Sequence, residues 1–190
     1  MVCIAAFLLT FVHSLKSSSM KEKTLDLRKV FGMIVIYDEN QQLVSPEMSF
    51  DVITELYPGG ESTIHIHPQQ EEIYEVKSGE MQVYLDNAWR NLKAGERITI
   101  PKGTVHAFRN KSMQKAIAFN SHKPGLRFGE MLETIQKYIN DGKITSTRGF
   151  KNLAYLSSIM VEYSDVMKTI KPPSTVIRLM SKLGRVFGFK

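Results

Sequence analysis

Residues 59–79 read GGESTIHIHPQQEEIYEVKSG, and this stretch decides the fold and the chemistry of the chain. His65 and His67 are separated by one residue, and in a β-strand such positions project from the same face. One strand can therefore offer a metal ion two imidazole nitrogens. Glu72 follows beyond a polar turn, where we expect the next strand, and His106 begins a further strand. A lone histidine on an apolar face is usually a hydrogen-bonded core residue, but three in one register with a glutamate favour a metal site.

Three imidazoles and one carboxylate suit iron, manganese, nickel, copper or zinc, because all of these ions accept nitrogen and oxygen ligands. The sequence therefore predicts one divalent transition metal ion, whose identity the ligands leave open. An octahedral ion held by these four groups keeps up to two positions open for water, dioxygen or substrate.

The motifs around these residues resemble those of the cupin superfamily. The first motif is Gly59-x5-His65-x-His67-x4-Glu72-x6-Gly79, and the second is Gly95-x5-Pro101-x-Gly103-x2-His106-x3-Asn110. The resemblance implies a mainly β fold, the double-stranded β-helix or jelly-roll barrel. It also implies that the metal is held inside the barrel by His65, His67, Glu72 and His106. Some cupins fold without a metal, so a vestigial site is the alternative, although none of the four ligands is missing here.

The periodicity of the chain divides it into three parts. Residues 31–123 carry short runs of alternating apolar residues separated by Gly, Pro, Asn and Asp, which predicts the strands of the cupin barrel. Residues 124–190 change to helical spacing and predict about three helices after the barrel. Residues 1–30 form a leader and N-terminal element, whose apolar part is 1–15.

Alternation with the ligands also predicts a pocket inside the barrel. Tyr74 and Phe108 share the interior face, and we expect Phe119 or a neighbour to join them, which suggests an apolar, aromatic pocket for a small organic molecule. The alternative is that these side chains only fill a small barrel. Glu72 is the candidate catalytic residue, because the resemblance to quercetinase-like cupins implies that it can leave the metal and act as a base.

Composition and charge exclude several function classes. Cys3 is the single cysteine, so an intramolecular disulfide framework and a CxxC zinc site are excluded. The net charge is +6, but residues 31–170 carry 15 basic and 17 acidic side chains, so the excess lies at the two ends. A slightly acidic body disfavours nucleic acid as a partner.

The two ends raise questions of location and assembly. Residues 1–15 contain no charged side chain and are shorter than the roughly 20 residues of a membrane-spanning helix. They predict an anchor or packed element, a start at Met20 in place of Met1, or a signal peptide at 1–19 and export. Residues 176–187 predict a basic amphipathic helix, which packs on the barrel or in a dimer interface, or makes peripheral membrane contact. We expect a cytoplasmic homodimer, with membrane association through this helix as the variant.

The leading functional hypothesis is a metal-dependent, dioxygenase-like enzyme acting on a small organic molecule. The second is a non-catalytic ligand-binding or sensor protein, suggested by the long helical segment after the barrel. The third is a metal-dependent sugar isomerase or epimerase, which draws on the breadth of the superfamily alone.

Overall fold

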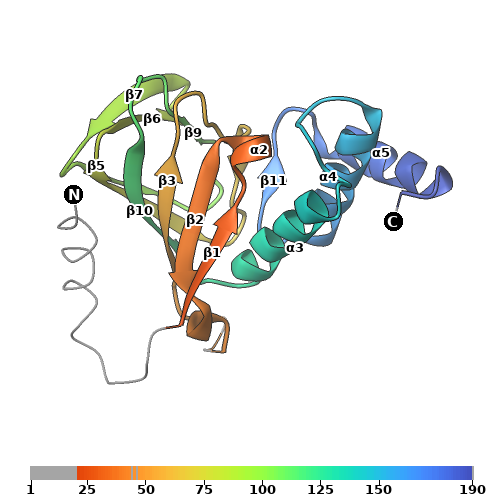
Figure 1. Ribbon diagram of the computed structural model, residues 1–190, viewed down its shortest axis with the longest axis horizontal. Coiled ribbons are helices and arrows are strands. Elements are labelled where there is room, and N and C mark those ends of the chain that lie inside the picture. The colour runs from red at the N-terminus through yellow and green to blue at the C-terminus, as the bar shows by residue number, and fades with distance from the viewer. Residues whose placement is uncertain (1–20, 44, 46, 190) are drawn as a thin grey trace.

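A large antiparallel sheet faces two smaller ones, and together they form the jelly-roll barrel that the alternating strands predict (Figure 1). The computed structural model describes residues 21–189 except 44 and 46, so the predictions for residues 1–19 and for a start at Met20 lie outside the described residues. The larger sheet has, in spatial order, β1 (Glu22–Asp26), β2 (Met33–Asp38), β3 (Phe50–Leu56), β10 (Ala116–Lys123), β5 (Glu71–Ser78) and β8 (Arg97–Ile100). A short helix α2 (Arg28–Phe31) joins β1 to β2, and a 3₁₀ helix η1 (Glu39–Leu43) follows β2.

The opposite face of the barrel consists of shorter pieces. β7 (Ala88–Lys93), β6 (Glu80–Leu85) and β9 (Ala107–Arg109) form one sheet, and β4 (His65–Ile66) pairs with β11 (Lys168–Thr169) in another. Bridges between His65 and His106 and between Glu61 and Arg109 join these two pieces. The strand with the first two histidines therefore lies beside the strand that follows the third.

Strict alternation of buried residues explains why these segments form strands. In β3, Phe50, Val52, Thr54 and Leu56 are buried and the intervening residues are partly exposed. A two-residue period places every second side chain in the core, where each large apolar group contributes about 1.5–3 kcal/mol. The same alternation in β5 buries Glu72 among apolar neighbours, so the regularity that builds the core also carries a charged group into it.

The two sequence motifs meet at their outer ends, around Asn110. The side-chain amide of this fully buried residue donates to the carbonyls of Leu56 at 2.9 Å and Gln114 at 2.7 Å. Its backbone N–H donates to the carbonyl of Gly60, and its own carbonyl accepts from Gly59. The start of the first motif is thus bonded to the end of the second, which fixes the loop that leads to His65.

Glycine is required where this loop passes the turn after α2. A Cβ added at Gly60 would lie 2.5 Å from the carbonyl oxygen of Gly32. Gly32 itself has φ +68°, in the left-handed region that favours glycine. The backbone at Gly60 therefore approaches the backbone at Gly32 more closely than any side chain at Gly60 would allow.

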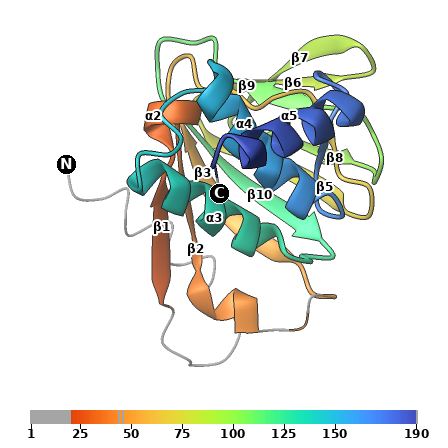
Figure 2. The ribbon, with the colours of Figure 1, turned by 90° about the vertical axis from the view of Figure 1, so that its right-hand side faces the viewer.

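Three helices cover one side of the barrel (Figure 2). They are α3 (Phe128–Asn140), α4 (Phe150–Glu162) and α5 (Ser174–Val186), and they lie within residues 124–190, where the helical spacing predicts about three helices. α3 buries Met131, Leu132 and Ile135. α5 packs on α4 through Gly184, whose missing side chain leaves room for Ala154: an added Cβ would lie 2.8 Å from that of Ala154.

The segment between α4 and α5 returns to the barrel, which the sequence did not predict. β11 pairs with β4, with Thr169 opposite His65, and Ile170 N–H donates to the carbonyl of Ile64 at 2.9 Å. The helical extension is therefore hydrogen-bonded to the strand that contains His65 and ends directly before His67. In the described part of the chain, every helix is too short or too polar to cross a membrane.

Candidate metal centre

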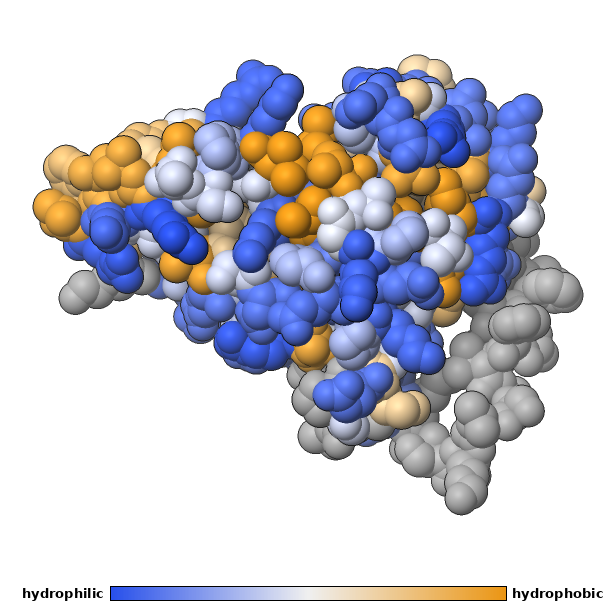
Figure 3. Space-filling model, turned by 180° about the vertical axis from the view of Figure 1, so that it is seen from behind, coloured by the Kyte–Doolittle hydropathy of each residue, from blue (hydrophilic) through white to orange (hydrophobic). Residues whose placement is uncertain are grey.

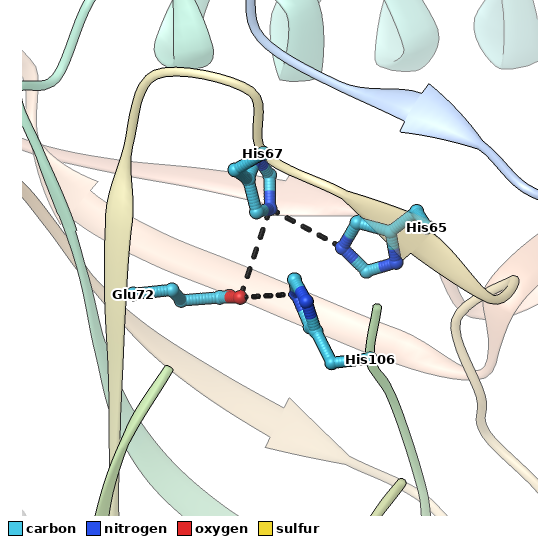
Figure 4. A group of neighbouring side chains, drawn as sticks. All are labelled: His65, His67, Glu72 and His106. Atoms are coloured by element: carbon cyan, nitrogen blue, oxygen red, sulfur yellow. Dashed lines mark hydrogen bonds and ion pairs between the residues drawn. The ribbon is translucent and has the colours of Figure 1, made fainter. Parts of the chain in front are cut away.

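Four buried side chains converge inside the barrel, as the sequence motifs predict (Figure 4). The candidate ligand atoms of His65, His67, Glu72 and His106 all lie within 4.8 Å of one another. His65 Nε2 and His67 Nε2 are 3.2 Å apart, and Glu72 Oε2 lies 2.6 Å from His106 Nε2 and 3.6 Å from His67 Nε2. All four side chains are at most 3 % exposed.

Backbone carbonyls fix the tautomer of each of these three histidines. The Nδ1 atom of His65 lies 2.7 Å from the carbonyl of Thr63, that of His106 lies 2.8 Å from Thr104, and that of His67 lies 2.8 Å from Val166. A carbonyl only accepts, so each Nδ1 carries the proton and donates it. In a neutral imidazole the other nitrogen then keeps its lone pair. Three Nε2 lone pairs are thereby directed at the same small space.

Val166 belongs to the helical extension, 99 residues after His67. The carbonyl that orients one of the four candidate ligands thus comes from outside the barrel. Outer hydrogen bonds of this kind fix the direction of a metal-binding imidazole.

The donor set fits a cation. With Nδ1 protonated, His65 Nε2 and His67 Nε2 are two acceptors facing each other at 3.2 Å, an arrangement that needs a positive charge between or beside them. Glu72 Oε2 and His106 Nε2 are fully buried atoms without a hydrogen-bond partner, and such orphaned acceptors are costly unless an ion compensates them. A divalent transition metal with nitrogen and oxygen ligands meets this requirement.

Burial keeps two of the imidazoles neutral. It lowers the pKa of His65 well below its ordinary value, and it lowers the pKa of His67 to about 4. Burial also acts to lower the pKa of His106, but the negative charge of Glu72 outweighs it and raises that pKa. Without a metal, a proton on His106 can therefore pair with Glu72, and a metal ion would replace that proton.

Asn120 and His122 hold the second oxygen of Glu72, and the sequence analysis did not identify either. Asn120 Nδ2 donates to Glu72 Oε1 at 2.9 Å, and His122 Nε2 lies 3.1 Å from the same oxygen. The ring of His122 stacks on that of Phe128 at 3.6 Å between centroids. One signal was present: in the run of 116–123, Asn120 and His122 continue the two-residue period of the buried Ala116 and Ala118 and therefore face inward.

The surroundings of Glu72 favour its ionised form. Burial acts to raise its pKa, but the positive charges and hydrogen bonds of His122 and His106 prevail and hold the pKa well below the ordinary value. A carboxylate with a depressed pKa is a good ligand and a weak base. This favours the ligand role of Glu72 over the base role.

A cavity of about 370 Å³ adjoins the four-residue cluster, with His65, His67 and Glu72 in its wall. Phe108 also lines this cavity. Tyr74 is buried and its ring lies 5.5 Å from that of Phe108, but it lies outside the cavity wall. Burial, reinforced by the charge of Glu72, raises the pKa of the Tyr74 hydroxyl well above its ordinary value.

The expectation that Phe119 faces the interior is corrected in favour of its neighbour. Ala118 and Asn120 are buried, so the two-residue period turns Phe119 to the other face of β10. Its ring there lies 5.7 Å from Lys77 Nζ. Asn120 lines the cavity in its place. Contact of Tyr74 or Phe108 with a substrate stays a prediction.

Fold and cluster together define a jelly-roll protein with a buried candidate metal centre. Residues 52–121 match the family model described as the cupin domain. The chain therefore carries a cupin domain over these residues.

Among known proteins, it is 38% identical over 82 residues to oxalate oxidase 1 of Hordeum vulgare, a match that covers 37% of this chain and 41% of that protein. It is 40% identical over 53 residues to protein SchB of Streptomyces halstedii, covering 28% of this chain and 38% of that protein. Each of these matches spans about two fifths of the relative's own length.

The similarities to solved structures cover more of both chains. A protein with a double-stranded β-helix domain from Klebsiella pneumoniae is 27% identical and covers 44% of this chain and 73% of that one, with a TM-score of 0.40. The polyketide cyclase RemF from Streptomyces resistomycificus is 19% identical and covers 58% and 80%, with a TM-score of 0.49.

Proposed function

We propose that this protein is a metal-dependent enzyme with dioxygenase-like chemistry that acts on a small organic molecule. The observation that carries the proposal is the convergence of three Nδ1-protonated histidines and one ionised glutamate at the wall of a cavity. The similarity to oxalate oxidases over the barrel supports oxygen-dependent chemistry, while the activity of the whole chain is part of the proposal.

In this proposal His65, His67, Glu72 and His106 hold the ion. A bound divalent transition metal supplies a Lewis acid and, if it is iron, manganese or copper, a redox centre. The protein's own residues orient the metal ligands and shield the reacting molecule from water. Asn120 and His122 keep Glu72 Oε1 away from the cluster, and the backbone carbonyls hold the imidazoles in the metal-binding tautomer. The mainly apolar lining of the cavity limits the access of water to the reacting molecule.

The base role of Glu72 is part of the proposal and can be separated from its ligand role. Glu72→Gln keeps the shape and an oxygen donor but removes the charge. If Glu72 is only a ligand, substrate binding to the loaded variant persists and turnover falls in proportion to the lost metal. If Glu72 also takes a proton, turnover falls further than metal content.

Elemental analysis and oxygen uptake test the proposed function together. We expect about one transition metal ion per purified chain, and oxygen consumption with one or more substrates from a panel of flavonoids, thiols and keto acids. His65→Ala should lose both. Absence of a stoichiometric metal in the purified, metal-supplemented protein would refute the proposal.

A sensor function is favoured by one separate observation, the bond between the helical extension and the ligand strand. Because β11 pairs with β4 and Val166 orients His67, a change at the cluster reaches the segment between α4 and α5 directly. Hydrogen exchange of residues 163–173 with and without bound metal would test this. Slower exchange on metal binding, without any turnover, would favour the sensor over the enzyme.

A further inference from the structure

The cavity beside the cluster extends well beyond the barrel. One wall comes from the larger sheet and the helix α2; it includes Leu27, Phe31, Met33, Val35 and Val52. The other wall comes from α3, α4 and α5; it includes Met131, Ile135, Leu156, Met160, Ile177 and Met180. The helical layer thus covers one side of a partly open cavity, and three residues of the cluster line the same cavity.

Apolar side chains make up most of the lining of this cavity. Among the described residues that line it, Glu72 and Lys171 are the two acidic or basic side chains besides the histidines, and Lys171 is exposed. The remaining polar groups are the hydroxyls of Ser and Thr side chains, Asn120 and three histidines, and the rest is aliphatic, aromatic or thioether. A phosphate placed against the apolar part would lose water and gain few partners, and burying an unpaired charge costs more than the about 1–3 kcal/mol of an unpaired neutral group.

The size of the cavity also limits its occupant. About 370 Å³ is within the range of pockets that enclose drug-sized ligands. A dianion with two carbons, such as oxalate, would leave most of the apolar wall unfilled.

Resting on the proposed function, we propose that the substrate of this site is an uncharged, mainly apolar molecule, of the size of a fused aromatic ring system, with one oxygen directed at the metal end. Sugar phosphates and small dicarboxylates are excluded by the same walls. The helical extension is then part of the substrate site, because α3, α4 and α5 each supply part of its lining.

The test uses 2-naphthol as the uncharged probe, with oxalate and fructose 6-phosphate as the charged comparators. Binding to the full chain is measured by calorimetry, first on protein dialysed against a chelator and then on metal-loaded protein. We expect 2-naphthol to bind both forms and the two comparators to bind at least tenfold more weakly. Because the metal-free protein is tested too, a failure of metal binding and a failure of the cavity give different results.

Variants on α4 locate the probe. Leu156→Trp fills the cavity and should weaken 2-naphthol binding at least tenfold. Val161→Trp adds the same side chain to the same helix away from this cavity and should leave binding unchanged. If Leu156→Trp does not fold, Met160→Trp replaces it on the same wall. Unchanged affinity in a folded cavity variant, no binding of 2-naphthol, or tighter binding of either charged comparator would overturn the proposal.

A second inference rests on α5 alone, whose surface is divided into three faces. Ile177, Ser181 and Gly184 are buried against the rest of the protein. At 100° per residue, a second face carries exposed apolar side chains, namely Val176, Leu179, Leu183, Val186 and Phe187, from 37% to 80% exposed. The third face carries Arg178, Lys182 and Arg185, all exposed. Figure 3 shows the apolar face as part of a projection at one end of the molecule.

Apolar and cationic faces that lie side by side on an exposed helix match an anionic bilayer. Residues 171–190 contain five basic and no acidic side chains, so no charge of their own opposes such a surface. A 13-residue helix is too short to span a membrane, but it can lie in the interface with its apolar face in the acyl boundary. We infer that α5 docks this protein on anionic membranes.

Co-sedimentation with vesicles tests the docking surface. The full chain should bind phosphatidylcholine vesicles that contain 30% phosphatidylglycerol, and bind pure phosphatidylcholine weakly. Replacement of two cations in Lys182→Glu/Arg185→Glu should reduce binding by at least about 30-fold. The double variant Lys102→Glu/Lys111→Glu changes charge equally at exposed barrel positions and should bind as the wild type does.

The competing occupant of the apolar face is a second copy of the chain. Analytical ultracentrifugation without lipid distinguishes the two. A dimer that Leu183→Glu dissociates would assign the face to self-association and overturn membrane docking. Equal loss of vesicle binding in both double variants, or no binding to the anionic vesicles, would overturn it as well.

Discussion

Asn120 provides the sharpest test of how the cluster is organised, because it touches Glu72 but none of the other candidate ligands in the described structure. Its amide donates to Glu72 Oε1 at 2.9 Å and to the carbonyl of Ile73 at 3.1 Å. Asn120→Ala removes both bonds. The carboxylate of Glu72 then loses one of the two groups that keep Oε2 pointed at the cluster.

Two effects of this substitution oppose each other. A hydrogen bond to a charged group contributes about 1.5–3 kcal/mol, so its loss makes Glu72 more basic and a stronger donor to a metal. Loss of orientation acts the other way, and removing an outer partner of a metal ligand typically weakens metal binding by about 10- to 100-fold. Because that observed loss is the net result of both effects, we expect the loss of orientation to prevail over the gain in basicity. Since His122 still lies 3.1 Å from the same oxygen, we expect a loss of about tenfold.

The assay is the Kd for Mn²⁺ or Zn²⁺, measured by competition with a chromogenic chelator. Ser121→Ala is the matched control, because the adjacent Ser121 bonds to Asp51 away from the cluster. It should keep the wild-type Kd. If Asn120→Ala has native circular dichroism and a Kd within threefold of wild type, the role assigned to Asn120 is wrong.

Three further outcomes follow from the structure. Asn110→Ala removes the amide bonds to the carbonyls of Leu56 and Gln114, the first of them buried, and should lower the free energy of unfolding by about 3 kcal/mol in urea titrations; a loss below about 1 kcal/mol would contradict the joining of the two motifs. Gly184→Val forces a methyl group against Ala154 and should loosen α5, seen as faster proteolysis of the C-terminal segment; unchanged proteolysis would refute that packing. Metal at 100 times its Kd should stabilise the chelator-treated protein by about 2.7 kcal/mol, or roughly 5–11 °C in Tm, and a similar shift in His65→Ala would place the ion elsewhere.

Sequence reasoning predicted the four converging side chains because their spacing is local. His65 and His67 share a strand face through a period of two, and Glu72 follows after one turn. The prediction of His106 as a ligand rested on the second motif, in which two glycines and Pro101 mark the turns before this histidine. The alternating strands and the change to helical spacing near residue 124 could also be predicted, because both are local patterns in the sequence.

The features that the sequence did not predict depend on contacts between segments that are far apart in the chain. His122 and Asn120 reach Glu72 through the pairing of β10 with β5, and no short-range pattern gives that register. Phe119 misled because a large aromatic residue is expected in a core, whereas the small Ala118 occupies the inward position. The return of residues 166–170 to β4 lies in a stretch without a strong β pattern.

The bond between His67 and the carbonyl of Val166 also bears on the order of events during synthesis. A ribosome delivers both sequence motifs long before residue 166, so a nascent barrel has His67 in place with its Nδ1 proton unsatisfied. Closing a loop of 99 residues carries an entropic cost that local turns do not. The cluster therefore reaches its final arrangement late, after the extension has emerged, and a metal ion bound earlier would meet only part of the finished site.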